Sequence, residues 1–193
     1  MVRMSLYASL FYKSVITSEA QTKLMKYAAL MHDIGKIGIP DTILLKPGRL
    51  TTQEFHLMKN HTLIGARMLS NSKRDVIKMG YEIALNHHEK WDGSGYPSGL
   101  VGTKIPLSAR VAAIADVFDA LSTDRVYKKA YPIETCIEMM REQRNKHFEG
   151  ELVDLFLSKM DEILMEKHMI DLRFQQPINE DVFSVIFNNS LII

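Results

Sequence analysis

Cysteine is almost absent from this 193-residue chain, and the single Cys136 excludes an internal disulfide bridge. No uninterrupted run of about 18 apolar residues occurs, and no signal-peptide pattern is present, so the sequence offers no membrane segment. The 24 lysines and arginines nearly cancel the 23 aspartates and glutamates, so composition favours neither DNA, RNA nor acidic lipid as a partner. We therefore expect a cytoplasmic protein that folds in a reducing compartment.

The chain does have apolar residues at helical spacing. They make up 46% of the sequence, which is enough to bury a sizeable core. Ser18 with Gln21 and Thr51 with Glu54 are spaced as capping boxes at two helix starts. Cys136 falls within one of the helical patterns, which predicts an inert core thiol. The spacing predicts helices over residues 6–15, 18–33, 51–68, 76–87, 107–120, 133–144 and 152–163.

Side chains that can bind metal recur on these predicted helices. His32 and Asp33 are adjacent at the end of the second helix, where Gly35 permits the chain to turn. His61 shares a helical stripe with Leu57, Ile64 and Met68, and His87 shares one with Val76, Gly80 and Ile83. His88 follows His87 at once, and Asp116 is the one carboxylate on a face of small residues in the helix over 107–120.

A single inward histidine is usually a core residue that donates a hydrogen bond to a backbone carbonyl. Several inward or adjacent imidazoles with nearby carboxylates are better explained by a shared metal than by separate hydrogen bonds. A carboxylate can also bridge two ions. The repeated pattern therefore predicts a metal centre.

A glycine-rich stretch follows His88 and is too interrupted to be a helix. Gly93 and Gly95 could let backbone N–H groups approach a phosphate, and Tyr96 could stack on a base or hold the loop in place. For Trp91 the structural role is favoured. Further along, Arg125 and Lys128 are candidate phosphate ligands, with a solvated charge run as the alternative.

Several motifs together resemble the HD-GYP family, from about Arg3 to about Leu164. They are His32-Asp33-Ile34-Gly35-Lys36, His61, His87-His88-Glu89, Asp92-Gly93-Ser94-Gly95-Tyr96-Pro97 and Ala115-Asp116-Val117-Phe118-Asp119-Ala120-Leu121. The resemblance implies an all-α HD-superfamily helical bundle with a metal site in its core. It implies a domain over residues 1–170, followed by a tail over 171–193 that could dock as a helix.

The resemblance also implies a phosphodiesterase that hydrolyses cyclic di-GMP, or a related cyclic dinucleotide, to linear pGpG or GMP with metal-activated hydroxide. Two or three divalent ions, iron or manganese, are implied. Asp33 is the implied bridge and, with Lys36, a catalytic residue. The implied metal ligands are His32, Asp33, His61, His87, His88 and Asp116, and the implied substrate contacts are Lys36, Tyr96, Arg125 and Lys128.

The sequence departs from the family pattern in two places. A further metal-binding histidine of the family falls just ahead of Met1, so we expect a truncated first helix. Asn145 and Phe148-Glu149-Gly150 replace the family's Gly and Phe-Asp-Pro, so we expect a weaker cap on the last main helix.

Family members usually carry an upstream sensory or receiver domain, and a homodimer is a further expectation. Two alternative functions stay open. One is another nucleotide phosphohydrolase of the HD superfamily, and the other is a catalytically impaired module that binds a dinucleotide or a protein.

Overall fold

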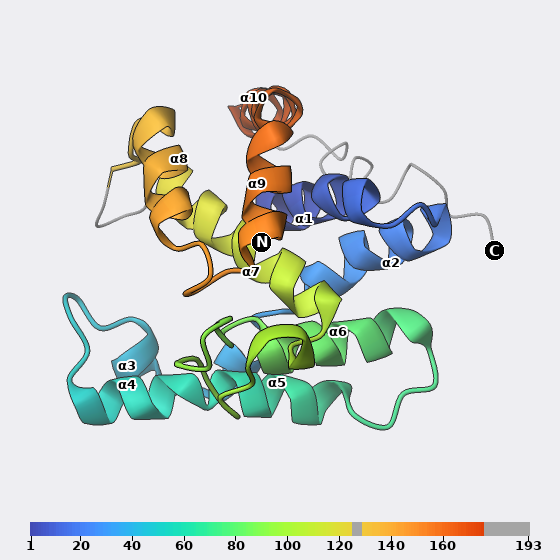
Figure 1. The fold of residues 1–193 in the computed structure, drawn as a ribbon. Helices are drawn as coiled ribbons and strands as arrows, with labels where there is room; N and C mark the ends of the chain where they lie inside the picture. The colour runs from blue at the N-terminus through green and yellow to red at the C-terminus, as the bar shows by residue number, and fades with distance from the viewer. Residues whose placement is uncertain (125–128, 176–193) are drawn as a thin grey trace.

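The computed structural model describes residues 1–124 and 129–175, with side chains described as far as Arg173. The predicted phosphate ligands Arg125 and Lys128 and the tail residues 176–193 lie outside the described residues. The described chain is all-helical, as predicted, with two isolated β-bridges (Figure 1). Its helices are α1 Val2–Val15, α2 Glu19–Ala29, α3 Asp41–Leu44, α4 Thr52–Lys59, α5 His61–Leu69, α6 Asp75–Asn86, α7 Leu107–Ser122, α8 Ile133–Glu142, α9 Gly150–Ser158 and α10 Met160–Gln175, with 3₁₀ turns η1 Ile34–Gly38 and η2 Gly102–Lys104.

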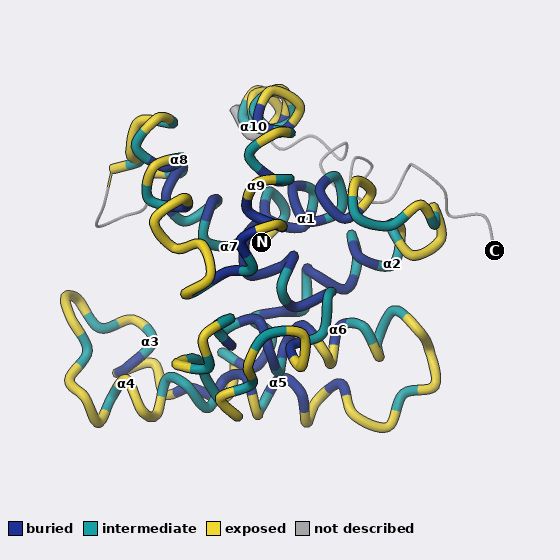
Figure 2. The backbone as a smooth tube through the Cα atoms, in the orientation of Figure 1, coloured by how far each residue is buried: buried dark blue, intermediate teal, exposed yellow. Residues whose placement is uncertain are grey.

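Helix α7 runs through the middle of the bundle and contacts α1, α6, α8 and α9. Figure 2 shows α7 as largely buried, whereas α4 is mostly exposed or half-buried. Small side chains on α7 let the neighbouring helices approach it closely on several sides. The buried alanines of α7 are Ala109, Ala112, Ala113 and Ala115.

Aromatic rings fill the core between α1, α7 and α9. Phe118 lies edge-on to Tyr7 at 5.7 Å and to Phe156 at 5.4 Å between ring centroids, and Phe156 meets Phe11 at 5.1 Å. Edge-to-face contacts of this length are favourable beyond the apolar area that they bury. Cys136 is fully buried beside this core, which agrees with the predicted core thiol.

The packing of α6 and of the 3₁₀ turn η1 brings distant parts of the sequence to one place. Helix α6 packs against both α2 and α5, and η1 packs against α5. The C-terminal ends of α2 and α6 and the N-terminal end of α5 therefore meet, which positions the site described below.

The prediction of one helix over residues 51–68 was wrong. The helix breaks at Asn60, and Leu57 and Met68 are 47% and 49% exposed, although His61 is buried. Helix α4 has no buried residue because it projects along the edge of the bundle, so its apolar side chains cannot face the core. The capping box of Thr51 with Glu54 is present at the start of α4.

The predicted helix over 152–163 is also divided. The chain leaves helical geometry at Lys159, and this change of direction lets Phe156 of α9 and Ile163 of α10 both enter the core. Helix α10 continues past residue 170 to Gln175, and its Asp171 accepts a hydrogen bond from Arg3 of α1 at 2.5 Å.

The start of α9 is capped from a distance. Glu149, at the N-cap position, makes no side-chain cap hydrogen bond. Instead the Oδ1 atom of Asn145 accepts from the N–H of Gly150 at 3.1 Å. Among the described helices, none is both long and apolar enough to cross a bilayer.

Candidate metal centre

A close approach of backbones assembles the site. His32 and Asp33 lie between α2 and η1, and His61 opens α5. A Cβ atom on Gly35 would lie 1.9 Å from the carbonyl oxygen of His61 and 2.4 Å from the nitrogen of Gly65. Only glycine therefore lets η1 lie so close to α5, and this contact places Asp33 beside His61.

Backbone carbonyls orient three of the imidazoles. Because a carbonyl oxygen only accepts, the Nδ1 atoms of His32, His61 and His87 each carry a hydrogen, so in a neutral ring the lone pair is on Nε2. Metal-binding histidines are commonly oriented in this way, because the ring nitrogen that does not bind the metal donates a hydrogen bond to a neighbouring group. The accepting carbonyls belong to Ala29, Met58 and Ile83, at 2.7, 2.7 and 2.9 Å.

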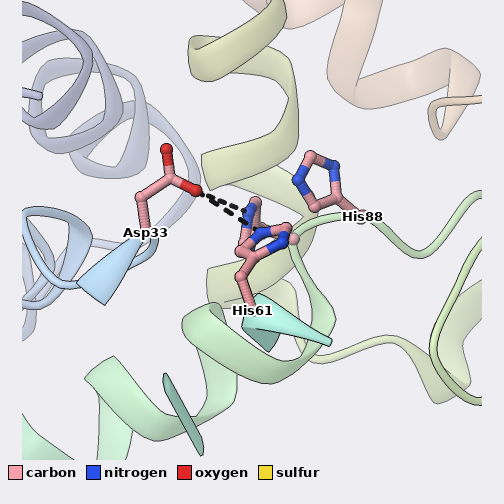
Figure 3. Close-up of side chains that lie close together, drawn as sticks. Asp33, His61 and His88 are labelled. Atoms are coloured by element: carbon pink, nitrogen blue, oxygen red, sulfur yellow. Dashed lines mark ion pairs between the residues drawn. The ribbon is translucent and has the colours of Figure 1, made fainter. Parts of the chain in front are cut away.

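The two carboxylate oxygens of Asp33 face different partners, and Figure 3 shows one of them directed toward His61. Oδ1 lies 3.4 Å from Nε2 of His61 and 3.8 Å from Nε2 of His87. Oδ2 lies 3.3 Å from Nε2 of His32 and 2.6 Å from the ammonium of Lys36. Asp33 therefore stands between two groups of potential ligands.

Asp33 and three histidines on one side of it fit a divalent ion. Ligand atoms of Asp33, His61, His87 and His88 all lie within 4.8 Å of one another. Oδ1 of Asp33 and Nε2 of both His61 and His87 are buried without a hydrogen-bond partner. A buried polar atom without a partner costs about 1–3 kcal/mol, so a cation at this point would stabilise the arrangement. Imidazole with carboxylate is a donor set that suits iron, manganese or zinc.

The electrostatics also suit a cation. Burial lowers the pKa of His61, lowers that of His87 well below its usual value, and lowers that of His88 to about 3. Burial alone would raise the pKa of Asp33, but the contact with His32 and the charge of Lys36 outweigh it and lower that pKa. His61, His87 and His88 are therefore neutral and Asp33 is ionised at pH 7, which are the protonation states that bind metals.

The other predicted ligands lie at the second oxygen of Asp33. Nε2 of His32 is 3.8 Å from Oδ1 of Asp116, whose side chain is 28% exposed. Burial alone would lower the pKa of His32, but Asp33 and Asp116 outweigh it and raise that pKa. The structure thus brings His32 and Asp116 together, outside the four-residue cluster. Lys36, a predicted phosphate contact, is 40% exposed and paired with Asp33.

The glycine-rich loop lies against this cluster. The Tyr96 ring stacks on His88, with centroids 4.8 Å apart and planes 25° apart. The Lys59 ammonium lies 5.1 Å from the Tyr96 ring and 5.0 Å from the Phe55 ring. Sequence reasoning missed Lys59 and Phe55. Their four-residue spacing just before His61 was the available signal, because it places both on one helix face.

Comparisons with known proteins place the chain in a family. The HD domain family model matches residues 2–152. The chain is 48% identical over 155 residues to the cyclic di-GMP phosphodiesterase response regulator RpfG of Xanthomonas campestris, which covers 80% of this chain and 41% of that protein. It is 49% identical over 146 residues to a cyclic di-GMP phosphodiesterase of Thermotoga maritima, with 76% and 40% covered.

A third relative acts on another dinucleotide. The chain is 44% identical over 162 residues to the 3'3'-cGAMP-specific phosphodiesterase 2 of Vibrio cholerae, with 84% of this chain and 31% of that protein covered. The chain therefore spans less than half the length of these three relatives.

Solved structures share the fold. A HDG"Y"P protein from Bdellovibrio bacteriovorus matches with a TM-score of 0.64 and 18% identity, over 83% of this chain and 51% of that one. The V-cGAP3 phosphodiesterase of Vibrio cholerae matches with a TM-score of 0.63 and 16% identity, over 96% and 52%. With the matched family model, the related sequences and the shared helical fold, the chain belongs to the HD domain family, in its HD-GYP branch.

Proposed function

We propose that this domain is a metal-dependent phosphodiesterase that hydrolyses cyclic di-GMP or a related cyclic dinucleotide. The observation that carries the proposal is the convergence of unpartnered ligand atoms from Asp33, His61 and His87 beside the loop that bears Tyr96. Relatives at 44–49% identity bear the names of cyclic di-GMP and 3'3'-cGAMP phosphodiesterases, which supports this substrate class.

The proposed metal ligands fall into two sets that share Asp33. Oδ1 of Asp33 would join His61, His87 and His88 around one ion. Oδ2 would join His32 and Asp116 around a second, which makes Asp33 the bridge. Bound iron or manganese ions would supply two effects, a lower pKa for water and polarisation of the phosphodiester.

Other side chains would bind and orient the substrate. The Lys36 ammonium, which is paired with Asp33 and partly exposed, would donate a hydrogen bond to a phosphate oxygen. Burial and the charge of Asp33 raise the pKa of Tyr96, so its phenol stays protonated and can donate while its ring stacks on a base. We retain Arg125 and Lys128 as proposed phosphate contacts.

Anaerobic hydrolysis of cyclic di-GMP with Fe(II) or Mn(II), with chromatography of the products, tests the proposal. We expect His87→Ala to lower turnover by at least about 100-fold. Removing only a hydrogen-bond partner of a metal ligand already costs about 10–100-fold in activity, and this variant removes a proposed ligand itself. His168→Ala is the matched control, since this histidine is exposed on α10. Wild-type turnover in His87→Ala would refute the metal assignment.

A substrate panel separates the alternatives. Faster turnover of a mononucleotide than of any cyclic dinucleotide would favour a general HD-superfamily phosphohydrolase. Tight dinucleotide binding without product, unchanged by metal, would favour a binding module. Similar rates on cyclic di-GMP and 3'3'-cGAMP would indicate a relaxed base preference. An upstream sensory domain, a homodimer, a docking tail and a cytoplasmic location stay predictions.

A further inference from the structure

Glu89 follows His88 directly, yet neither the metal centre nor the proposed chemistry uses it. Its side chain lies inside the protein, and the residue is only 2% exposed. Oε1 accepts the N–H of Ser98 at 2.7 Å, and Oε2 accepts the N–H of Leu100 at 3.0 Å. One carboxylate therefore ties the start of the glycine-rich loop to its far end, beyond Tyr96.

Backbone contacts close the same loop. The N–H of Tyr96 donates to the carbonyl of His88 at 3.1 Å. A Cβ atom on Gly95 would lie 2.3 Å from the nitrogen of Lys90 and 2.5 Å from the Cα of Glu89. The loop thus packs directly against the backbone of residues 88–90, next to the point where the Tyr96 ring stacks on the His88 ring.

We propose that Glu89 is a positioning residue that holds the loop closed and keeps the Tyr96 ring over His88. Hydrogen bonds to a carboxylate are roughly twice as strong as bonds between neutral groups, so each of these two bonds should hold the loop more firmly than one of its backbone hydrogen bonds. A ring held in advance loses less conformational freedom when a base stacks on it. The consequence for substrate rests on the proposed function, whereas the closure of the loop does not.

Glu89→Gln is the variant that tests this role. Glutamine has nearly the same shape but one accepting oxygen, so its amide N–H₂ would face one of the two backbone donors. Asp92→Asn is the matched control in the same loop. Oδ1 of Asp92 accepts both bonds, from the N–H and the Oγ of Ser94, so an asparagine can keep them.

The only tryptophan of the chain, Trp91, reports the loop directly. The backbone N–H of Trp91 donates to the carbonyl of His147, and the backbone carbonyl of Trp91 accepts from the N–H of Gly102, both at 3.0 Å. We expect acrylamide to quench tryptophan fluorescence about twofold more strongly in Glu89→Gln than in the wild type or Asp92→Asn. Urea denaturation of all three proteins shows whether the fold is retained. Equal quenching in three folded proteins would overturn the proposal.

Kinetics test the consequence for substrate. We expect Glu89→Gln to raise KM for cyclic di-GMP about 10-fold, with little change in kcat. Hydrolysis of bis(p-nitrophenyl) phosphate, a diester without a purine, and metal content should stay unchanged. Equal losses on both substrates together with lost metal would overturn the positioning role and show that Glu89 supports His88 instead. If the wild type cleaves neither diester, the proposed function fails, and the quenching result alone decides the role of Glu89.

Discussion

Replacing Gly35 with alanine tests how the metal centre is assembled. The new methyl group would lie 1.9 Å from the carbonyl oxygen of His61, whereas an ordinary van der Waals contact between such atoms is at least 3.4 Å long. The neighbouring atoms are backbone, so no flexible side chain can move aside. Either η1 separates from α5 by about 1.5 Å, or the chain distorts locally.

This displacement has two measurable consequences. Overpacking of this kind costs about 1–3 kcal/mol of stability. Asp33 lies two residues before Gly35, so a shift of η1 moves its carboxylate away from His61. Metal–ligand distances are held to within about 0.2 Å, so we expect metal affinity to fall at least about 100-fold.

Urea denaturation of the metal-free protein measures the first effect, and anaerobic titration with Mn(II) or Fe(II) measures the second. Ile37→Ala is the control, because Ile37 lies in the same 3₁₀ turn and is 79% exposed. Gly35→Ala with wild-type metal affinity and with stability within about 0.5 kcal/mol of the wild type would refute the close-approach argument.

Three further predictions concern a buried histidine, a buried aromatic ring and the proposed metal. Burial and the charge of Lys90 lower the pKa of His147 from 6.5 to about 4, so its contribution to stability is complete above pH 6.5 and is lost as pH falls toward 4. NMR titration of that ring should find a midpoint near pH 4, and a midpoint near 6.5 would contradict the burial. Phe118→Ala should cost about 3–5 kcal/mol in urea denaturation, since the ring is fully buried; a loss below about 1 kcal/mol would show that the core can close around the gap. Chelation of the metal should lower the melting temperature by roughly 5–10 °C when metal was present at about 100 times its Kd, and His87→Ala should show no such shift.

Much of this protein could be predicted from local patterns. The period of apolar residues predicts most of the helices, and the capping box of Thr51 with Glu54 marks the start of α4, because helix formation depends on neighbours within a few residues. The recurrence of histidine on inward faces indicated a shared site. The structure brings His61, His87 and His88 around Asp33, as that pattern suggested.

The tertiary structure decided what no local pattern contains. Leu57 is exposed because α4 lies along the edge of the bundle, and the path of a helix past the core depends on how the rest of the chain packs. The division of the two Asp33 oxygens between His61 and His32 requires η1 to lie against α5, and that contact depends on the close approach at Gly35.

Glu89 shows the same limit. The sequence places an acidic residue after His88, but an acidic residue beside a loop is ordinarily solvated. Only the return of the chain from Tyr96 to Leu100 brings two N–H donors to its carboxylate. The sequence by itself therefore determined most of the helices and the kinds of ligand. Long-range backbone contacts decided which atoms face one another, because such contacts join residues that no helical period relates.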